Sequence, residues 1–458
     1  MVESMSNFRP INRDTGFLLP PSVDEWLPQG HLARFVGEVI DGLDLSELVK
    51  AYRGSGSASY HPSMLLGLMV YGYATKTFSS RAIERASYDS VAFRFIAGNE
   101  HPDHDTIATF RKRFLPQIQA LFVEVLKLAR AMGMLKLGTV ALDGTKIHAN
   151  ASRHSALSYG HAKKIEKQLR KEVQQLLRLA EQADGVNTPD GMSIPEELER
   201  RELRLAAIAA AKAQIEARAD ERLEHEQAEH QSKLAARAEQ EKRTGKKPRG
   251  RPPEPPTGGV QDKDQVNLTD DDSRIMRVAG GGFDQCYNAQ AVVATGSMLI
   301  VAAEITQAAN DKEQLVPMIQ KLQALPKQLG RVKRILTDNG YFSARNVEQC
   351  ATAKIEPLIA TGRTAHHMSW RRRFAAAPKS PPDSATPLQK MAHRLKTPRG
   401  RKLYALRKQT PEPPVFGIIK SVMGYRQCLV RGLESVKGEW NLVAMSWNIK
   451  RMFALQRC

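Results

Sequence analysis

The sequence predicts a mixed α/β fold, in which one sheet has helices on both faces. An all-helical domain precedes the sheet, and a long helical hairpin interrupts it. Three observations predict this arrangement. Apolar residues recur every three to four positions up to residue 136, and a stretch rich in Ala, Glu, Lys and Arg fills residues 155–245. Beyond residue 263, short β-branched runs alternate with helical patterns, which is typical of an α/β core.

The composition is typical of an intracellular protein that binds polyanions. The chain has 458 residues, of which 41% are hydrophobic, enough for about two to four domains. Lys and Arg number 68 against 49 Asp and Glu, and the formal charge of +19 is typical of proteins that neutralise phosphates. Basic proteins of unrelated function share such a charge. Four cysteines without a CxxC pair indicate neither a disulfide framework nor a zinc ribbon. With no apolar stretch suited to export or membrane spanning, we expect a cytoplasmic, nucleoid-associated protein without a membrane partner.

Residues 1–136 are expected to form the helical N-terminal domain. Asp105 is the expected cap of a helix that carries the cations Arg111 and Arg113. Short helices with outward cations suit a helix-turn-helix variant that binds DNA ends, so both arginines are candidate DNA contacts. A helical bundle with surface arginines is the alternative. We interpret the acids and histidines of residues 101–105 as a capped turn rather than a metal site.

Residues 155–245 are expected to form an antiparallel helical hairpin, followed by a basic Pro/Gly-rich linker at residues 246–262. Two apolar seams mark its helices: Ile165, Leu169, Val173, Leu176 and Ala180, then Leu198, Leu205, Ile208 and Ile215. Dimerisation, folding back on itself and a solvated spacer all stay open. In the linker, Arg249 and Arg251 flank a glycine as in AT-hooks, whose arginines enter a minor groove. Such a tetrapeptide also arises by chance in basic linkers.

The sheet is expected to begin at residues 137–154 and to continue through residues 263–458. TVALDGTKIHA supplies its first strand, and two further strands meet at the turn formed by residues 295–297. Helix, strand, helix and strand follow, then a basic irregular loop at residues 361–410. Three strands followed by alternating helices and strands resemble an RNase H-like core.

Three acids stand out in this pattern. Asp143 lies within a predicted central strand, where a lone carboxylate is unusual. Asp338 ends a strand before an Asn-Gly turn, at the edge where α/β sheets place their sites, although ordinary turn chemistry also explains it. Glu412 precedes VFGIIKSVMG, in which Val415, Ile418, Ile419 and Val422 form the apolar face of an expected helix. Helix-dipole stabilisation is the simpler explanation for this glutamate.

Together the three carboxylates suit a magnesium site. Mg²⁺ prefers oxygen ligands and takes one or two carboxylates per ion. Two ions about 4 Å apart can assist the attacking and leaving oxygens of a phosphodiester displacement. Glu434 and Glu439 are rival third acids, but they lie in the later segment GLESVKGEWN and lack the arrangement of Arg and Lys that surrounds Glu412, so we favour Glu412.

Several segments resemble a bacterial insertion-sequence transposase of the DDE class. They are LDGTKIHANAS, LTDNGYFS and RKQTPEPPVFGIIKSVMGYRQCLVRGLESVKGEWNLVAMSWNIKRM, with FLLPPSVDEWLP through HPDHDTIATFRKRF nearer the N-terminus. The resemblance implies an RNase H-fold catalytic domain that cuts transposon ends and joins them to target DNA, with Mg²⁺, or Mn²⁺ as a substitute. It assigns Asp143, Asp338 and Glu412 as the catalytic and metal-binding triad. The family's Tyr, Arg, Glu, Lys signature maps onto Tyr404, Arg407, Glu412 and Lys420, so that Arg407 and Lys420 hold phosphates beside Tyr404.

The resemblance has one departure and leaves alternatives. Relatives run Glu-Pro-Val-Phe-Gly, whereas this chain has one more proline between Glu412 and Val415. The added residue rotates Glu412 by about 100° or is absorbed by an extended cap. The alternative to an active transposase is therefore a nonenzymatic DNA-binding protein derived from one. A nuclease that cuts without joining and an oligomerisation scaffold are further alternatives.

Lys146 is a candidate phosphate contact or an ordinary surface lysine. Expected partners are double-stranded DNA, as transposon ends and target, and further copies of the chain.

Overall fold

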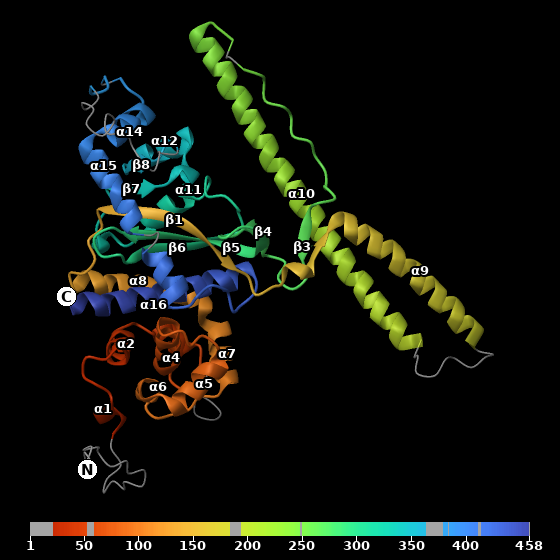
Figure 1. The fold of residues 1–458 in the computed structure, drawn as a ribbon, viewed down its shortest axis with the longest axis horizontal. Coiled ribbons are helices and arrows are strands. Elements are labelled where there is room, and N and C mark those ends of the chain that lie inside the picture. The colour runs from red at the N-terminus through yellow and green to blue at the C-terminus, as the bar shows by residue number, and fades with distance from the viewer. Residues whose placement is uncertain are drawn as a thin grey trace, which may run out of the picture.

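The computed structural model has a sheet-containing body, a helical N-terminal part and a long projecting arm (Figure 1). It describes residues 22–52, 59–183, 194–247, 250–362, 379–382, 384–410 and 414–457. Two predicted site residues, Glu412 and Arg249, lie outside the described residues. Over the described ranges, no helix is both long and apolar enough to cross a membrane.

The N-terminal part is helical, as predicted. Its central helix, α4, is apolar on all sides and almost fully buried, and Pro62 occupies its first turn, where the missing amide costs no hydrogen bond. The helices are α1 (Val23–Trp26), α2 (Leu32–Asp41), α3 (Ser46–Lys50), α4 (Pro62–Ala74), α5 (Ser80–Asp89), α6 (Val91–Ile96), α7 (His104–Phe114), the 3₁₀ turn η1 (Leu115–Gln117) and α8 (Ile118–Ala131).

The predicted cap of α7 was wrong by two residues. The Asp103 carboxylate, not that of Asp105, accepts the amide of Thr106 at 2.7 Å. His104 Nδ1 lies 2.9 Å from Glu84 Oε2 on the neighbouring helix α5, so this histidine joins two helices. Residues 101–105 therefore form a capped turn.

The sheet is mixed, with β1 at its centre. β1 pairs antiparallel with β5 on one side and parallel with β7 on the other, and β7 pairs parallel with β8. β5 also pairs antiparallel with β6 along one half and with β4 along the other. The order is therefore β6-β5-β1-β7-β8. The strands are β1 (Thr139–His148), β4 (Arg274–Arg277), β5 (Phe283–Ala294), β6 (Ile300–Thr306), β7 (Arg334–Thr337) and β8 (Glu356–Ile359).

Helices cover the sheet on both sides (Figure 1). α11 (Leu315–Ala324) and α12 (Ala344–Thr352) lie on one side, with the 3₁₀ turn η3 (Lys327–Leu329) after α11. α8 and the C-terminal helix α16 (Leu433–Gln456) lie on the other, and α16 packs along β6 and α8. Trp440 on α16 is fully buried and donates its indole N–H to the Gln290 carbonyl at 3.1 Å. This tryptophan is therefore a core residue.

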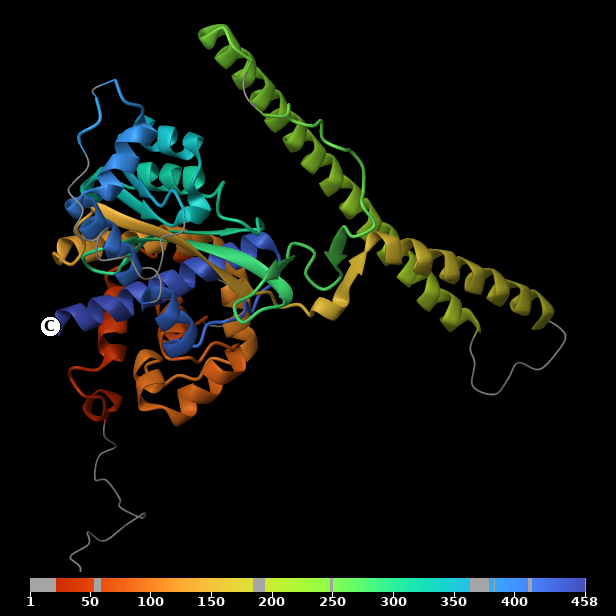
Figure 2. The same cartoon turned by 45° about the horizontal axis from the view of Figure 1, so that its top comes forward.

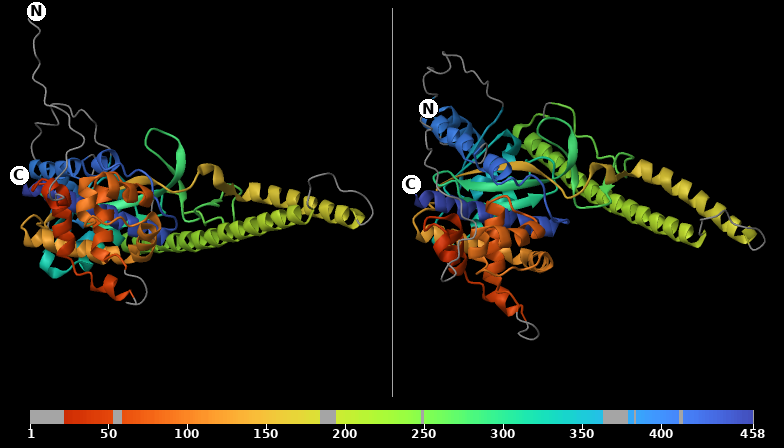
Figure 3. Two further views of the ribbon diagram at one scale, coloured as in Figure 1. Left: turned by 90° about the horizontal axis from the view of Figure 1, so that it is seen from below. Right: turned by 60° about the horizontal axis from the view of Figure 1, so that its bottom comes forward.

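The arm lies within the bounds of the predicted hairpin, but its two helices are unequal, with 25 residues in the first and 51 in the second. α9 (Tyr159–Ala183) packs against only the first part of α10 (Ile194–Thr244), with Leu169, Ile208 and Ile215 in their shared core. The second half of α10 continues past the sheet body (Figures 1 and 2). The returning linker runs along that half, where Arg237 donates to the carbonyls of Gly250 and Arg251. Figure 3 shows the same extended arm from two further sides.

A small two-stranded sheet closes the base of the arm. β2 (Ala156–Ser158), after the 3₁₀ turn η2 (Arg153–Ser155), pairs antiparallel with β3 (Gln265–Asn267). The Tyr159 amide donates to the Asp264 carbonyl at 2.8 Å. The arm therefore leaves and re-enters the body through one pair of adjacent strands.

The predicted irregular loop at 361–410 is partly helical, which corrects the sequence interpretation. Its helices are α14 (Pro387–Lys396), α15 (Pro398–Ala405) and the 3₁₀ helix η5 (Leu406–Gln409). Thr386 and Gln389 form a capping box, and Thr397 caps α15. Both helices carry proline in the first turn, where it starts a helix rather than breaking one.

The helix predicted after Glu412 has π geometry instead of α geometry. The π-helix η7 spans Ile418–Val422. Val415, Phe416, Ile419 and Met423 are buried, whereas Val422, predicted to lie on the apolar face, is 51% exposed. The i→i+5 bonding of a π-turn changes which side chains face the core, and this explains the error.

Candidate active site

Asp143 lies within β1 and contacts an arginine from a distant part of the chain. Its side chain is 7% exposed, and Oδ2 lies 3.1 Å from Nη1 of Arg407 on η5, whose side chain is 17% exposed. Asp143 Oδ1 accepts the amide of Gly144 at 2.9 Å. A mostly buried carboxylate needs such a cation to offset its desolvation.

Asp338 follows the last residue of β7 and caps a 3₁₀ turn, η4 (Asn339–Tyr341). Its Oδ1 accepts the amide of Gly340 at 2.8 Å, and the residue is half-buried. The parallel pairing of β1 with β7 runs to Ala141 opposite Leu336. Continuing that register by two residues brings Asp143 beside Asp338, on strands about 4.8 Å apart.

Tyr404 lies over the same face of the sheet. It packs with Ala141 and Leu336, which precede Asp143 and Asp338 by two residues and so share their face. The Tyr404 hydroxyl donates to the Thr337 carbonyl at 3.2 Å. Burial raises the pKa of Tyr404, with a contribution from the two aspartates, while Arg407 opposes it. Asp143 and Asp338 therefore both contribute to the raised pKa of the Tyr404 phenol.

Lys420 on η7 contacts β1 two residues beyond Asp143. Its Nζ donates to Thr145 Oγ1 at 2.6 Å and to the Lys146 carbonyl at 2.7 Å. Thr145 shares the face of Asp143 because side chains two apart in a strand point the same way. Tyr404, Arg407 and Lys420, all from the C-terminal segment, therefore gather around the first acid.

Lys146 occupies the opposite face of β1. Its side chain is half-buried, and burial lowers the pKa of its ammonium, an effect opposed by the carboxylate of Asp311. Its alternation with Asp143 separates it from Arg407 and Lys420. The predicted phosphate contact of Lys146 therefore concerns the other side of the sheet.

The remaining predicted DNA contacts lie far apart. Arg251 is exposed and forms an ion pair with Glu254 at 2.8 Å. Arg113 is exposed, donates to the Ala51 carbonyl and lies over the ring of Tyr52. Arg111, by contrast, is 7% exposed and donates to the Phe78 carbonyl at 2.6 Å. Its burial favours a structural role that surface spacing did not predict.

The rival third acids have other partners. Glu434 is exposed and pairs with Lys437 at 2.8 Å. Glu439 on α16 is fully buried and accepts the Tyr73 hydroxyl of α4 at 2.5 Å and the Leu429 amide at 3.0 Å. Burial raises the pKa of Glu439. Glu439 therefore joins the helical part to the sheet body.

A buried polar cluster lies on the face of the sheet opposite Asp143, and the sequence pattern did not lead us to predict it. Asn288 and Gln290 of β5 are fully buried, and both donate to the carboxylate of Asp311 at 2.7 Å. Tyr341, also fully buried, donates to Gln290 Oε1. The sequence signal was the alternation of Asn and Gln in the otherwise apolar run YNAQAVVA.

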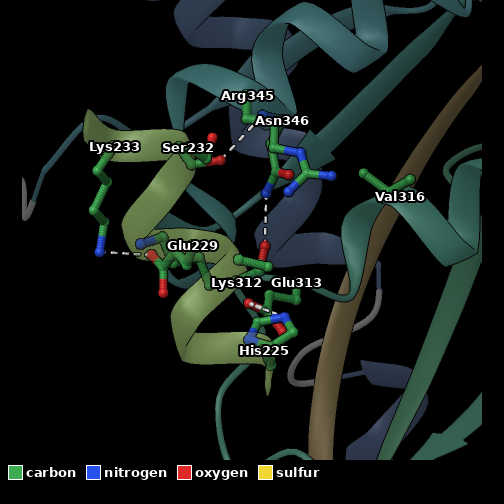
Figure 4. Close-up of a pocket in the computed structure, with 11 residues that line it drawn as sticks. His225, Glu229, Ser232, Lys233, Lys312, Glu313, Val316, Arg345 and Asn346 are labelled. Carbon is green, nitrogen blue, oxygen red and sulfur yellow. Dashed lines mark hydrogen bonds and ion pairs between the residues drawn. The ribbon is translucent and has the colours of Figure 1, made fainter. Parts of the chain in front are cut away.

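A groove of about 510 Å³ separates α10 from the starts of α11 and α12 (Figure 4). Its charged side chains carry both signs: Glu229, Lys233, Lys312, Glu313 and Arg345. Lys233 pairs with Glu229 at 2.8 Å along α10. Ser343, which also lines the groove, caps α12 directly after the turn that carries Asp338. The arm and the body therefore meet close to the second acid.

The carboxylates suit a hard divalent cation in their donor chemistry, but the described part of the chain supplies two of the three predicted ligands. Asp143 and Asp338 offer the oxygen donors that Mg²⁺ prefers. Within the described ranges, no group of three or more His, Cys, Asp or Glu side chains is arranged to hold a metal ion. Glu412, the predicted third ligand, lies outside them.

A basic α/β protein with two carboxylates on neighbouring strands, and with Arg407 and Lys420 in contact with the strand of the first, is of a class suited to nucleic-acid chemistry. Two family models match the chain: a transposase domain (DUF772) over residues 21–113 and a transposase DDE domain over residues 373–453. Together they support an insertion-sequence DDE transposase. No curated protein and no solved structure matches the chain.

Proposed function

We propose that this chain is a DNA transposase that cuts the ends of its insertion sequence and joins them to target DNA. The observation that carries the proposal is the contact of Arg407 and Lys420 with β1 around Asp143. Both cations come from the segment matched by the transposase DDE domain. Asp143, Asp338 and Glu412 are the proposed catalytic and metal-binding residues.

We propose an RNase H-like identity for the sheet. The strand order β6-β5-β1-β7-β8, with β5 antiparallel to its neighbours and β1, β7 and β8 parallel, supports it. So does the position of Asp143 on the central strand and of Asp338 at the carboxyl end of the adjacent parallel strand.

The proposed cofactor is Mg²⁺, with Mn²⁺ as a substitute. Divalent ions held by carboxylate oxygens supply charge stabilisation and a more acidic nucleophile for phosphodiester displacement. Arg407 and Lys420 would hold the phosphates that flank the scissile bond, because both lie within contact of β1 at the acids. Tyr404 orients Arg407 by packing beside it.

The proposed DNA contacts extend beyond this site. Arg113 on α7 and Lys146 on β1 are candidates on the body, and Arg249 and Arg251 are candidates on the returning linker. Arg111 enters only as a support for its neighbours, because its guanidinium is buried. The ends of an element are paired before joining, so we propose that the chain acts as a homo-oligomer on double-stranded DNA.

The proposed division follows the elements. Residues 1–136 bind DNA ends, residues 137–154 begin the catalytic core and residues 263–458 complete it. Residues 155–245, with the linker 246–262, form an inserted arm. The closure of the arm by β2 and β3 supports treating it as a separate unit.

The test is cleavage and strand transfer with purified protein, end-labelled element DNA and Mg²⁺. Asp143→Asn is expected to abolish both reactions, because a neutral amide lacks the negative charge with which a carboxylate holds a divalent cation. Binding of the same DNA in Ca²⁺ should remain. A wild-type protein that binds the ends but never cuts them would favour the alternative, a DNA-binding protein derived from a transposase. Cutting without joining would favour a nuclease.

A further inference from the structure

A chain of buried hydrogen bonds crosses the sheet behind the two aspartates. It begins at Asp311, in the loop between β6 and α11, and passes through Gln290 of β5 to Tyr341 of η4. Gln290 and Tyr341 are fully buried. Tyr341 ends the turn that Asp338 caps, so the chain reaches the second acid from the strand next to the first.

The direction of every bond in this chain is fixed by Asp311. Asp311 Oδ1 accepts from Gln290 Nε2 at 2.7 Å, which sets the orientation of the Gln290 amide. Its Oε1 then faces Tyr341 and accepts the phenolic proton. Asn288 donates to the same Asp311 oxygen at 2.7 Å and leaves its own oxygen for Gln290 Nε2 at 3.1 Å. The amide of Gln290 therefore has one satisfied orientation.

A second connection holds the same turn. The Asn346 side chain donates to the Tyr341 carbonyl and to the Lys312 carbonyl, both at 2.7 Å. Lys312 directly follows Asp311. The loop of Asp311 and the turn of Asp338 are thus joined through both a side chain and the backbone of Tyr341.

Gly144 provides the space for this chain beside Asp143. Gln290 lies opposite Gly144 in the register of β1 and β5. A Cβ at Gly144 would collide with Gln290 Nε2 and would lie 2.6 Å from Asp311 Oδ1. The side chains of Gln290 and Asp311 therefore lie against the backbone of Gly144, which directly follows Asp143. Consistent with this proximity, Asp311, Asp143 and Asp338 all add to the effect of burial in raising the pKa of Tyr341.

We infer that Asp311, Gln290 and Tyr341 are positioning residues that set the place of Asp338 relative to Asp143, and so the affinity of the pair for a divalent cation. The inference rests on the proposed function. Hydrogen-bond partners behind metal ligands commonly change metal affinity or activity by about 10–100-fold when they are removed. None of the three residues needs to touch the metal or the DNA.

Tyr341→Phe tests the inference because it removes only the hydroxyl. Tyr287→Phe is the matched control: Tyr287 is equally buried, lies in β5 and donates to the Asp270 carboxylate at 2.9 Å, outside the chain described above. Mn²⁺ binding to the DNA-free protein is measured by electron paramagnetic resonance, and thermal unfolding is followed in parallel. Tyr341→Phe should weaken Mn²⁺ binding by about tenfold, and Tyr287→Phe should leave Mn²⁺ binding unchanged. Both variants should lose a similar amount of thermal stability, because each loses one buried hydrogen bond.

A second pair of variants distinguishes loss of the hydrogen bonds accepted by Asp311 from general disruption of the fold. Asp311→Asn keeps an oxygen that can accept from Asn288 and Gln290, so its Mn²⁺ affinity should stay close to that of the wild type. Asp311→Ala removes the acceptor and should weaken Mn²⁺ binding as Tyr341→Phe does. Equal weakening by Tyr287→Phe, or wild-type affinity in both Tyr341→Phe and Asp311→Ala, would overturn the inference.

DNA cleavage by the wild-type protein is assayed beside these measurements. If the wild type binds Mn²⁺ but does not cleave, the proposed function fails, while the comparison of variants still decides the positioning role. If the wild type binds no Mn²⁺, the positioning role is overturned as well.

Discussion

Arg407 Nη1 lies 3.1 Å from Asp143 Oδ2, so a guanidinium from the C-terminal segment neutralises the carboxylate at the centre of the sheet. The two side chains are separated by most of the chain and are both largely buried. A divalent cation bound at Asp143 would supply the same positive charge. The arginine therefore stabilises the folded protein around Asp143.

Arg407→Ala is expected to make folding more dependent on metal. Removing the cation from beside a mostly buried carboxylate should lower the free energy of unfolding by about 3 kcal/mol in EDTA. Mg²⁺ should then stabilise the variant more than it stabilises the wild type, because it replaces the missing charge. Denaturant unfolding with and without Mg²⁺ measures both effects. Arg407→Lys, which keeps the charge, is the control, and equal stabilisation of all three proteins by Mg²⁺ would contradict the prediction.

Lys420→Met is expected to remove one phosphate contact. The Nζ bonds to Thr145 and to the Lys146 carbonyl place this ammonium at the site. The slope of log K against log salt concentration for binding of element ends should fall in magnitude by about 0.9, the value for one released counterion. Thr145→Val is the matched control, since it removes the hydroxyl partner and leaves the cation. An unchanged slope in Lys420→Met would mean that the lysine only fastens η7 to β1.

Glu439 is expected to make stability fall as pH rises. Burial raises its pKa in the folded protein above the ordinary carboxyl value of 4.5, so the folded state holds the proton more tightly than the unfolded state. Its contribution to stability is complete below the unfolded pKa and is lost as pH rises through the folded pKa. Glu439→Gln should therefore gain stability relative to the wild type between pH 4.5 and neutral pH, by about 1.4 kcal/mol per unit of pKa difference.

Urea unfolding at several pH values measures this difference. Glu434→Gln is the control, because Glu434 is exposed and pairs only with Lys437 among the described residues. A pH-independent difference between Glu439→Gln and the wild type would show that Glu439 stays ionised at the contact with Tyr73.

Much of the fold followed from local patterns, and the failures have physical reasons. The turn at residues 295–297 was predicted correctly, because its short Thr-Gly-Ser sequence determines the local backbone geometry. The short strands β2, β3 and β4 were missed, since three or four residues carry no readable alternation. β2 and β3 pair with each other at the base of the arm, and β4 pairs with the end of β5 that extends beyond β6. The helices α14 and α15 were predicted as part of an irregular loop, although each has a proline in its first turn, a position that favours the start of a helix.

The site was predicted less completely than the fold. A lone acid in a strand indicated Asp143, and a strand-ending acid indicated Asp338. The contact of Asp143 with Arg407 depends on how distant segments pack, and residue spacing alone does not predict it. The bonds of Asp311 and Tyr341 to Gln290 depend in the same way on strand register.

Deletion of Pro414 is expected to be tolerated, because the π-helix η7 accommodates one residue more than an α-helix over the same span. Without that residue, the segment can adopt α geometry and keep Ile419 and Met423 in the core. The unfolding midpoint should shift by only about 2–4 °C or less, the effect of roughly 1 kcal/mol in a chain of this size, and cleavage should persist. Deletion of Ser446 from the buried α-helix α16 is the control and should prevent folding. Loss of folding in both variants would show that the added proline is a required part of this segment.

Removal of the arm is expected to leave a folded body. The Tyr159 amide and the Asp264 carbonyl are 2.8 Å apart, so a short Gly/Ser linker can replace residues 160–263 without moving either end. The arm also contacts the body through Arg218, which donates to the Asp271 carbonyl at 2.5 Å, and through Gln214, which donates to the Asp271 carboxylate at 2.6 Å. Loss of these bonds should cost about 1–3 kcal/mol, and the shortened chain should still unfold in one cooperative transition. Asp271→Ala in the full chain is the control for the side-chain contact alone.

Because Arg249 and Arg251 are removed with the arm, binding of element ends should also become less salt-dependent. A shortened chain without cooperative unfolding would show that the arm is part of the core rather than an insertion.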